Sequence, residues 1–160
     1  MKQKIEEQAE SLLLNNYEKY YRLAYSYAKN ESDALDIVQE SAYKVLKDIK
    51  KLKDQSLLST WIYRIVINTS IDFLRKRNNE TVSIYDLEIP HEDQYQDDDP
   101  KEMIAFLNEE ERTIVILKFF EDLKLEEIAD ALNMNVNTVK TRLYRALKKI
   151  RLLWKQNTSE

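Results

Sequence analysis

The stretch LNMNVNTVKTRLYRALKKIR, residues 132–151, carries six basic residues and no acidic one, although the whole chain has a formal charge of −4. Before it, the apolar spacing of LEEIADAL, residues 125–132, predicts a short amphipathic helix. Asparagine follows glycine in tolerating the left-handed conformation, so Asn133 is expected to end that helix and Asn135 to cap the next. A short helix, a tight turn and a longer basic helix form a helix-turn-helix pattern.

The second helix of this pattern, expected over about residues 136–155, has two chemically different faces. The apolar stripe consists of Val136, Val139, Leu143, Leu147, Ile150 and Trp154. The opposite face carries Asn137, Lys140, Thr141, Tyr144, Arg145, Lys148 and Arg151. A DNA major groove admits such a helix, with its first residues near base edges and later cations near phosphates. The alternative is a solvated basic face on a packed helix, but the lack of any acid favours DNA binding.

Charge is unevenly distributed along the 160 residues. Residues 1–77 have a net charge of +3, residues 78–111 of −11 and residues 112–160 of +4. Basic lobes suggest contact with a polyanion, and a strongly acidic middle is typical of a solvated linker. Both prolines fall within residues 78–100, which lack periodicity. We therefore predict an all-α fold with two small helical domains, 1–77 and 101–160, joined by an acidic flexible linker.

The first lobe is expected to contain three helices. Apolar and tyrosine residues predict one over about residues 5–29, ended by Asn30. The next, over about 33–50, would be capped by Ser32. The third, over about 59–76, has β-branched residues that also suit a strand, but its apolar positions fit a period of 3.6 better than a period of 2.

The second lobe is expected to begin with a short helix over about residues 101–107. Asn108 and Glu111 have the spacing of a capping box, which predicts a further helix over about 109–121. The helix-turn-helix pattern follows directly, so the whole lobe reads as helical.

Composition argues against several classes of site. The chain has no cysteine, no glycine and a single histidine, His91, which lies in an acidic stretch expected to be a solvated loop. Without glycine there is no phosphate-binding loop, and without cysteine the usual zinc sites cannot form. We therefore predict no catalytic residue, metal, cofactor or small-molecule substrate, and an enzyme ranks last. The polar N-terminus and the lack of a long apolar run make the cytoplasm the expected location.

Three blocks, spanning about residues 12–155 together, resemble a known family, the ECF (extracytoplasmic-function) sigma factors of bacterial RNA polymerase. DALDIVQESAYKVL (33–46) is similar to the helix that docks on the polymerase β′ subunit. STWIYRIVINTSIDFLRKR (59–77) is similar to the block that melts and reads the −10 element. LKLEEIADALNMNVNTVKTRLYRALKKIR (123–151) is similar to the reader of the −35 element. Their order around an acidic linker makes the resemblance specific.

The resemblance implies roles for particular residues. The candidates for binding the β′ coiled coil are Asp36, Gln39, Glu40, Tyr43 and Lys44. The candidates for −10 recognition and melting are Ser59, Thr60, Trp61, Arg64 and Asn68. The candidates for −35 recognition are Asn137, Thr138, Lys140, Thr141, Arg142, Arg145 and Lys148, with Lys140, Thr141 and Arg145 favoured. Two interpretations of Trp61 stay open, a wedge that stacks on an unpaired base and a core tryptophan.

Several further basic residues of the first lobe have an open role. Lys51, Lys53, Arg75 and Arg77 either steer phosphates or form a solvated basic surface. Asp72 is expected to hold an intramolecular bond to an arginine. Asn133 and Asn137 stand where members of the family commonly have glycine, so the turn is expected to form while the preferred −35 sequence is expected to differ.

The function that the resemblance implies is that of a non-enzymatic specificity subunit. It would be an alternative sigma factor that binds the β′ and β subunits of core RNA polymerase and directs promoter-specific initiation. Its other partners would be promoter DNA and a membrane-associated anti-sigma factor that sequesters it. One alternative is a helix-turn-helix regulator that binds DNA alone as a dimer. Another is a helical adaptor that uses its tyrosine-rich first lobe for protein contact.

Overall fold

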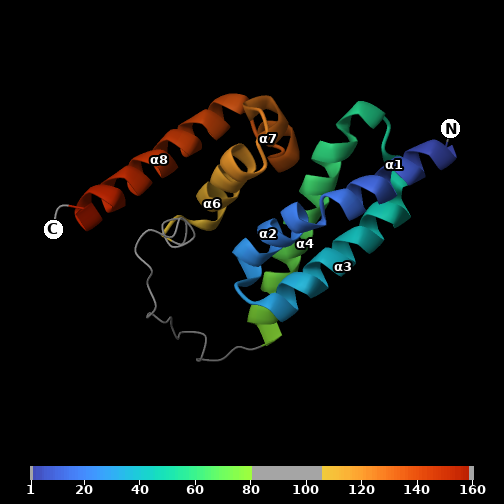
Figure 1. Ribbon diagram of the computed structural model, residues 1–160, viewed down its shortest axis with the longest axis horizontal. Coiled ribbons are helices and arrows are strands. Elements are labelled where there is room, and N and C mark those ends of the chain that lie inside the picture. The colour runs from blue at the N-terminus through green and yellow to red at the C-terminus, as the bar shows by residue number, and fades with distance from the viewer. Residues whose placement is uncertain (1, 81–105, 159–160) are drawn as a thin grey trace. The chain divides into compact units, whose positions relative to one another are not determined.

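The protein consists of helices joined by short turns in the computed structural model, which describes residues 2–80 and 106–158. No strand occurs in those two ranges, which confirms the all-α class. The chain divides into two compact units, Met1–Asn79 and Glu80–Glu160 (Figure 1). Most of the expected linker and of the expected helix at 101–107 lies outside the described residues.

The first unit is built from helices and two short 3-10 turns. The helices are α1 (Lys2–Asn15), α2 (Tyr17–Ala28), α3 (Glu31–Asp48) and α4 (Leu58–Glu80), and the 3-10 turns are Ile49–Lys51 and Gln55–Leu57. A two-residue connection reverses the chain between α2 and α3, which pack side by side (Figure 1). α4 is helical throughout, as its 3.6-residue period predicts, and continues to Glu80, past the start of the expected linker.

The single helix expected over residues 5–29 is in fact two helices. Asn16 has φ −110° and ψ 22° and separates α1 from α2. Its carbonyl then accepts hydrogen bonds from the backbone N–H groups of Lys19 and Tyr20, so α2 starts anew. A one-residue break leaves the apolar spacing on either side helical, and periodicity alone therefore does not reveal it.

The cap of α3 is Asn30 and not Ser32. The Asn30 Oδ1 atom accepts a hydrogen bond from the backbone N–H of Asp33 at 2.9 Å. The preceding helix ends at Ala28, one residue earlier than expected, and Lys29 after it takes the left-handed conformation with φ 64°. Asn30 therefore starts a helix rather than ending one, because its side chain can satisfy a free N–H of the next first turn.

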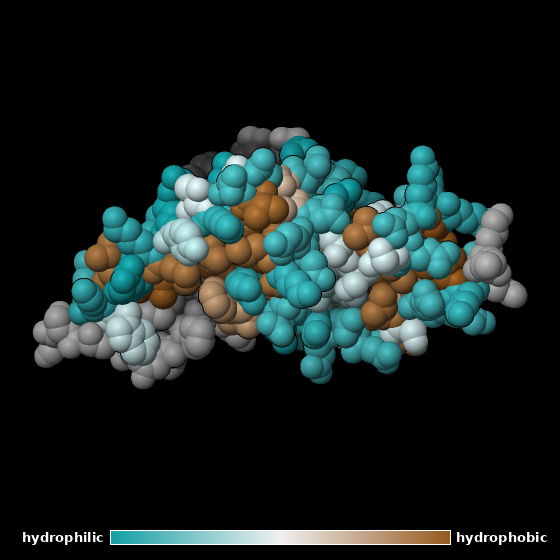
Figure 2. All heavy atoms as spheres, turned by 90° about the horizontal axis from the view of Figure 1, so that it is seen from above, coloured by the Kyte–Doolittle hydropathy of each residue, from teal (hydrophilic) through white to brown (hydrophobic). Residues whose placement is uncertain are grey.

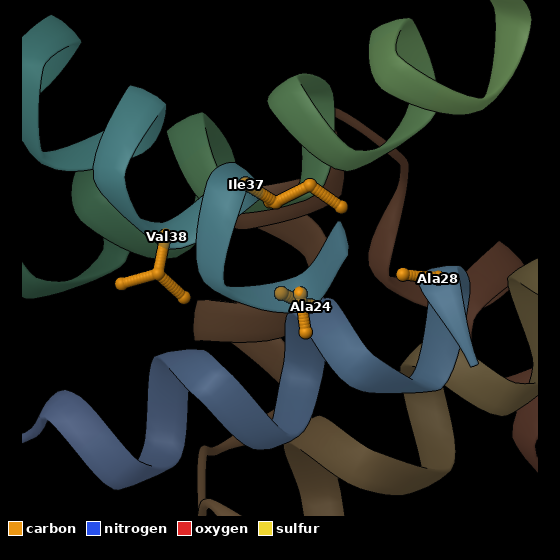
Figure 3. Close-up of a cluster of buried hydrophobic side chains, with 5 residues drawn as sticks. Ala24, Ala28, Ile37 and Val38 are labelled. Carbon is orange, nitrogen blue, oxygen red and sulfur yellow. The ribbon is translucent and has the colours of Figure 1, made fainter. Parts of the chain in front are cut away.

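Small side chains form the core between α2 and α3. Ala24, Ala28, Ala34, Ile37 and Val38 are buried together, and Figure 3 labels four of them on the two helices. Alanine lets helices approach closely, and the larger side chain of Ile37 fills the remaining space. The aromatic ring of Phe73 from α4 packs against this cluster. The cluster therefore fixes α3 against both neighbours.

A pair of tyrosines connects α2 to α4 in the same unit. The rings of Tyr20 and Tyr63 meet edge to face, with their centroids 5.4 Å apart, and both side chains are buried. Two buried serines of this unit donate to carbonyls of their own helix, Ser41 Oγ to Ile37 at 2.7 Å and Ser70 Oγ to Val66 at 2.8 Å. Such bonds allow a polar residue to face the core without an unsatisfied group.

The second unit contains α6 (Glu109–Val115), a π-helical turn (Ile116–Phe120), α7 (Leu125–Leu132) and α8 (Val136–Thr158). Both α6 and α7 pack against α8 (Figure 1). The predicted capping box is confirmed, since Asn108 Oδ1 accepts from the Glu111 N–H at 2.8 Å and Glu111 Oε1 accepts from the Asn108 N–H at 3.1 Å. The helix expected over 109–121 changes to π-helix in its second half.

The core of the second unit lies between α6, α7 and the first half of α8. Its most deeply buried side chains are Ile114, Leu117, Ile128, Val139 and Ala146. The predicted apolar stripe of α8 is therefore only partly covered, and Trp154 near its end is 49% exposed. Apolar side chains also reach the surface among hydrophilic ones in several places on the face that Figure 2 shows. No helix among the described residues is long and apolar enough to cross a membrane.

Candidate nucleic-acid and polymerase interfaces

The turn between α7 and α8 has the conformation that its asparagines predict. Asn133 is left-handed, with φ 57° and ψ 49°, and the Met134 N–H closes the end of α7 on the Ala129 carbonyl at 2.9 Å. Asn135 Oδ1 accepts a hydrogen bond from the Asn137 N–H at 2.8 Å, which caps α8. Both structural predictions for these asparagines are confirmed, and together they set the angle at which α8 leaves the turn.

The exposed face of α8 is basic along its whole length, and the helix contains no acidic residue. The predicted polar face is exposed at every position, namely Asn137, Lys140, Thr141, Tyr144, Arg145, Lys148 and Arg151. Thr141 Oγ1 donates its hydrogen to the Asn137 carbonyl at 3.0 Å, so its oxygen offers a partner only lone pairs. Thr138 is half-buried. A helix with this face presents cations and hydrogen-bonding groups to a polyanion.

Arg142 differs from the other predicted −35 residues, because it forms an ion pair with Glu110 of α6. About two turns nearer the end of α8, Lys149 Nζ donates to Glu111 Oε1 at 2.9 Å. Both pairs connect α8 to the first turn of α6. The structure thus places Arg142 at the edge of the basic face and directs its guanidinium toward α6.

Glu111 is a buried carboxylate, with a side chain only 3% exposed. Burial on its own raises the pKa of Glu111. The hydrogen bonds from Lys149 and from the Asn108 backbone N–H, with the charges of Lys149 and Arg145, outweigh that effect and hold the pKa of Glu111 below its usual value. The Glu111 carboxylate therefore helps to hold α8 against α6.

Acid is expected to destabilise the second unit through Glu111. Because the pKa is lower in the folded state than in the unfolded state, the carboxylate stabilises the fold above its unfolded pKa of about 4.3. That contribution disappears as the pH falls through the folded pKa. The measurement is the thermal midpoint of the wild type and of Glu111→Gln between neutral and acid pH, with exposed Glu109→Gln as control. Equal acid sensitivity in all three proteins would contradict this account.

The five predicted −10 residues differ in how far they reach the surface. Ser59 and Asn68 are exposed, Trp61 and Arg64 are half-buried, and Thr60 is buried with 6% exposed. Thr60 thus presents little surface to a ligand in this structure. Trp61 is neither fully in the core nor fully exposed, so both interpretations of it stay open.

A polar cleft of about 580 Å³ lies between α1 and the start of α4. The lining residues are Lys4, Glu7, Gln8, Ser11 and Leu12 from α1, and Gln55, Ser56, Leu58 and Ser59 from the other wall. Asp54 fixes that second wall, because its Oδ1 accepts hydrogen bonds from the Ser56 Oγ and N–H at 2.7 and 3.0 Å. The same bonds hold the pKa of Asp54 below its usual value. Sequence reasoning missed the wall from α1, which is more than 40 residues away along the chain.

The residues predicted to bind polymerase lie on α3. Asp36, Gln39, Glu40 and Tyr43 are exposed, and Tyr43 reaches 61%. Lys44 is the exception, because the residue is half-buried. Its Nζ donates to Thr69 Oγ1 on α4 at 3.3 Å. The first four residues form an exposed polar surface with one large aromatic ring, while Lys44 connects two helices.

Three of the further basic residues have acidic partners within the unit, and the first is Lys51, which pairs with Asp48 at 3.5 Å. Asp72 pairs with Arg75 at 3.6 Å, which confirms the predicted intramolecular bond. Arg77 pairs with Asp33 at 2.5 Å and thereby joins the last part of α4 to the start of α3. Arg77 is therefore a contact between helices and not simply part of a solvated basic surface.

Comparison with known proteins identifies the class to which these two helical units belong. Residues 12–80 match the family model of sigma-70 region 2, and residues 101–150 match that of sigma-70 region 4. RNA polymerase sigma factor SigV of Bacillus subtilis is 49% identical over 139 residues, which cover 83% of this chain and 82% of that protein. The ECF RNA polymerase sigma factor SigW of the same organism is 30% identical over 153 residues, 84% of this chain and 82% of that protein. The chain belongs to the ECF sigma factors.

Two solved structures share the fold. The sigma factor RpoE of Bartonella quintana, solved with the anti-sigma factor NepR, aligns with a TM-score of 0.76 at 24% identity, over 91% of this chain and 96% of that chain. CnrH, solved with the cytosolic domain of CnrY, aligns with a TM-score of 0.72 at 19% identity, over 96% of this chain and 97% of that chain. At these identities the likeness concerns the fold.

Proposed function

We propose that this chain binds core RNA polymerase and directs it to promoters, with the second unit gripping the −35 element and the first opening the −10 element. The observation that carries this proposal is the match of one chain to both sigma-70 regions, in order. A regulator that binds DNA alone, or a helical adaptor, accounts for only one of the two matched regions.

For the −35 element, we assign recognition to the exposed face of α8. Lys140 lies near the start of the helix, where side chains reach base edges in a major groove. Arg145 and Lys148 follow on the same exposed face and suit phosphates. The capped turn before α8 supports this role, because it fixes the first turn of the helix that meets DNA.

For the −10 element, we assign recognition to the first half of α4 and the segment before it. Ser59 and Asn68 offer exposed hydrogen-bonding groups, and the half-buried Trp61 supplies an aromatic ring of the kind that stacks on unpaired bases. Ser59 also lines the polar cleft between α1 and the start of α4. Thr60 fits a structural role better than contact with DNA, because it is buried.

For core polymerase, we assign docking to the exposed surface of α3. A surface that carries an exposed aromatic ring among polar groups is typical of protein interfaces. Tyr43 supplies that ring, and Lys47 Nζ lies 5.8 Å from its centroid, which favours one orientation of the tyrosine. Asp36 and Glu40 add negative charge and favour a basic partner surface. The β subunit is the other proposed contact of this chain on core polymerase.

Regulation is proposed to come from an anti-sigma factor. Both solved structures that share the fold were determined with a protein partner, which for RpoE is an anti-sigma factor. We propose that a membrane-associated anti-sigma factor holds this chain inactive until it is released to the cytoplasm. Pull-down from membranes of the source cell with the tagged chain tests this, and recovery of soluble partners alone would count against membrane association.

Run-off transcription with purified core RNA polymerase is expected to give discrete transcripts only when this protein is added. The template is fragmented DNA from the source genome, and core polymerase alone is the control. The start sites define the −35 and −10 elements that the two units read. Tight DNA binding by a dimer of the protein, with no transcripts and no binding to core polymerase, would instead establish the regulator.

A further inference from the structure

The first turn of α6 presents three successive acids, and their side chains have three different environments. Glu109 is exposed and forms no ion pair among the described residues. Glu110 pairs with Arg142 of α8 and is 41% exposed. Glu111 is buried, closes the capping box and pairs with Lys149. Glu111 therefore has a structural role, whereas the pair formed by Glu110 lies at the surface.

Arg142 lies at the border of the face proposed to meet DNA. At 3.6 residues per turn it stands about 60° around the helix from exposed Arg145. Its long, flexible side chain can swing either toward α6 or toward a phosphate beside Arg145. In the structure it pairs with Glu110, while Lys140, Arg145 and Lys148 form no ion pair with the described residues. While Arg142 is paired with Glu110, the exposed face of α8 therefore presents one cation fewer to DNA.

We propose that Glu110 limits the affinity of the second unit for DNA by holding Arg142 away from the phosphate backbone. This inference rests on the proposed −35 role of α8 and adds to it a residue that lies outside the helix-turn-helix. An exposed ion pair contributes little to stability, so Glu110 is not needed to hold α6 against α8. Glu110 is instead expected to lower the affinity for DNA, because DNA must compete with the Glu110 carboxylate for Arg142.

The matched control for Glu110 is its neighbour Glu109. Glu109→Gln and Glu110→Gln remove the same charge from the same helix turn, so both change the net charge and the field of the helix N-terminus alike. Only Glu110→Gln releases Arg142. A difference between these two variants therefore measures the ion pair and not the general loss of negative charge near DNA.

The experiment measures binding of the full chain to a fluorescent duplex that carries the −35 element and to a scrambled duplex. Glu110→Gln is expected to bind both duplexes about threefold to tenfold more tightly, because phosphates are common to both. The slope of log affinity against log salt is expected to steepen by about one. Glu109→Gln should change affinity by less than about twofold, since screened charges without contact act weakly.

Arg142→Ala provides the second, independent readout. In the wild-type chain it is expected to change affinity by less than about twofold, because Arg142 is already held by Glu110. In the Glu110→Gln chain it is expected to abolish the gain. Equal gains for Glu109→Gln and Glu110→Gln, a gain that survives Arg142→Ala, or a loss above about fivefold from Arg142→Ala alone would each overturn the proposal.

Run-off transcription by the wild type keeps this inference separate from the proposed function. If the wild type directs no transcription with core polymerase, the sigma-factor proposal fails whatever Glu110 does. If transcription occurs and Glu110→Gln binds DNA no better than the wild type, the proposal for Glu110 fails alone. Circular dichroism of each variant shows whether its helices are intact, and a loss above about fivefold from Arg142→Ala alone overturns the proposal even if Glu110→Gln does not fold.

Discussion

Promoter-directed transcription is expected to fall about fivefold to 150-fold when Lys140 is replaced with alanine, which corresponds to a loss of about 1–3 kcal/mol of discrimination. The side chain is exposed near the start of α8, on a helix whose turn is fixed by Asn133 and Asn135. A base-reading cation at this position cannot be replaced by water without losing its directional hydrogen bonds. The measurement is the transcript yield from one promoter at a fixed concentration of core polymerase.

Lys155→Ala is the matched control for Lys140→Ala. It removes the same charge from the same helix, about four turns further along. Its expected effect on transcript yield is less than about twofold, because only the first part of a recognition helix reaches base edges. Promoters with single changes in the −35 element then separate two mechanisms. A base contact relaxes discrimination at one position, whereas a phosphate contact weakens all promoters alike. Equal losses from both variants would contradict a reading role for Lys140.

The elements predicted most accurately are those set by residues close together in sequence. The left-handed turn at Asn133, the cap at Asn135 and the capping box of Asn108 with Glu111 involve partners no more than five residues apart. Such geometry follows from side-chain length and backbone conformation alone. The break at Asn16 is also local, yet it was missed, because the residue interrupts a helix without changing its apolar pattern.

The features that sequence did not predict depend on contacts between distant segments. Arg142 was assigned to DNA from its place in the recognition helix, and its partner Glu110 lies 32 residues away. Lys44 was assigned to polymerase, and its partner Thr69 lies 25 residues away. A helical pattern shows which face a residue occupies, but it does not show which neighbour packs against the edge of that face. Residues at such edges are therefore where an assignment from pattern is weakest.

Burial adds a second restriction on assigning function by resemblance. Thr60 belongs to the block that resembles a −10 reader, yet its side chain lies in the first turn of α4 and is buried. Its neighbour Ser59, one position around the helix, is exposed and lines the polar cleft. Since consecutive residues on a helix point about 100° apart, a contiguous motif cannot place all of its members at one surface.

Replacing Ile37 with alanine is expected to destabilise the first unit by about 2–5 kcal/mol, a typical loss for truncating a fully buried aliphatic side chain. Ile37 is 0% exposed and belongs to the buried cluster of α2 and α3 (Figure 3). Leu35→Ala is the matched control. It removes the same number of carbon atoms from the same helix, but Leu35 is 37% exposed, and its expected loss is below about 1 kcal/mol.

The two units carry one tryptophan each, Trp61 and Trp154, which makes the measurement specific. In a Trp154→Phe background, fluorescence during urea unfolding reports the first unit alone, and the midpoint gives the loss of stability. Ile37 stands between the proposed docking residue Asp36 and the buried Val38 on α3. Because a less stable first unit unfolds at a lower temperature, Ile37→Ala is also expected to weaken binding to core polymerase as temperature rises. Equal losses from Ile37→Ala and Leu35→Ala would show that the α2–α3 cluster does not hold that helix in place.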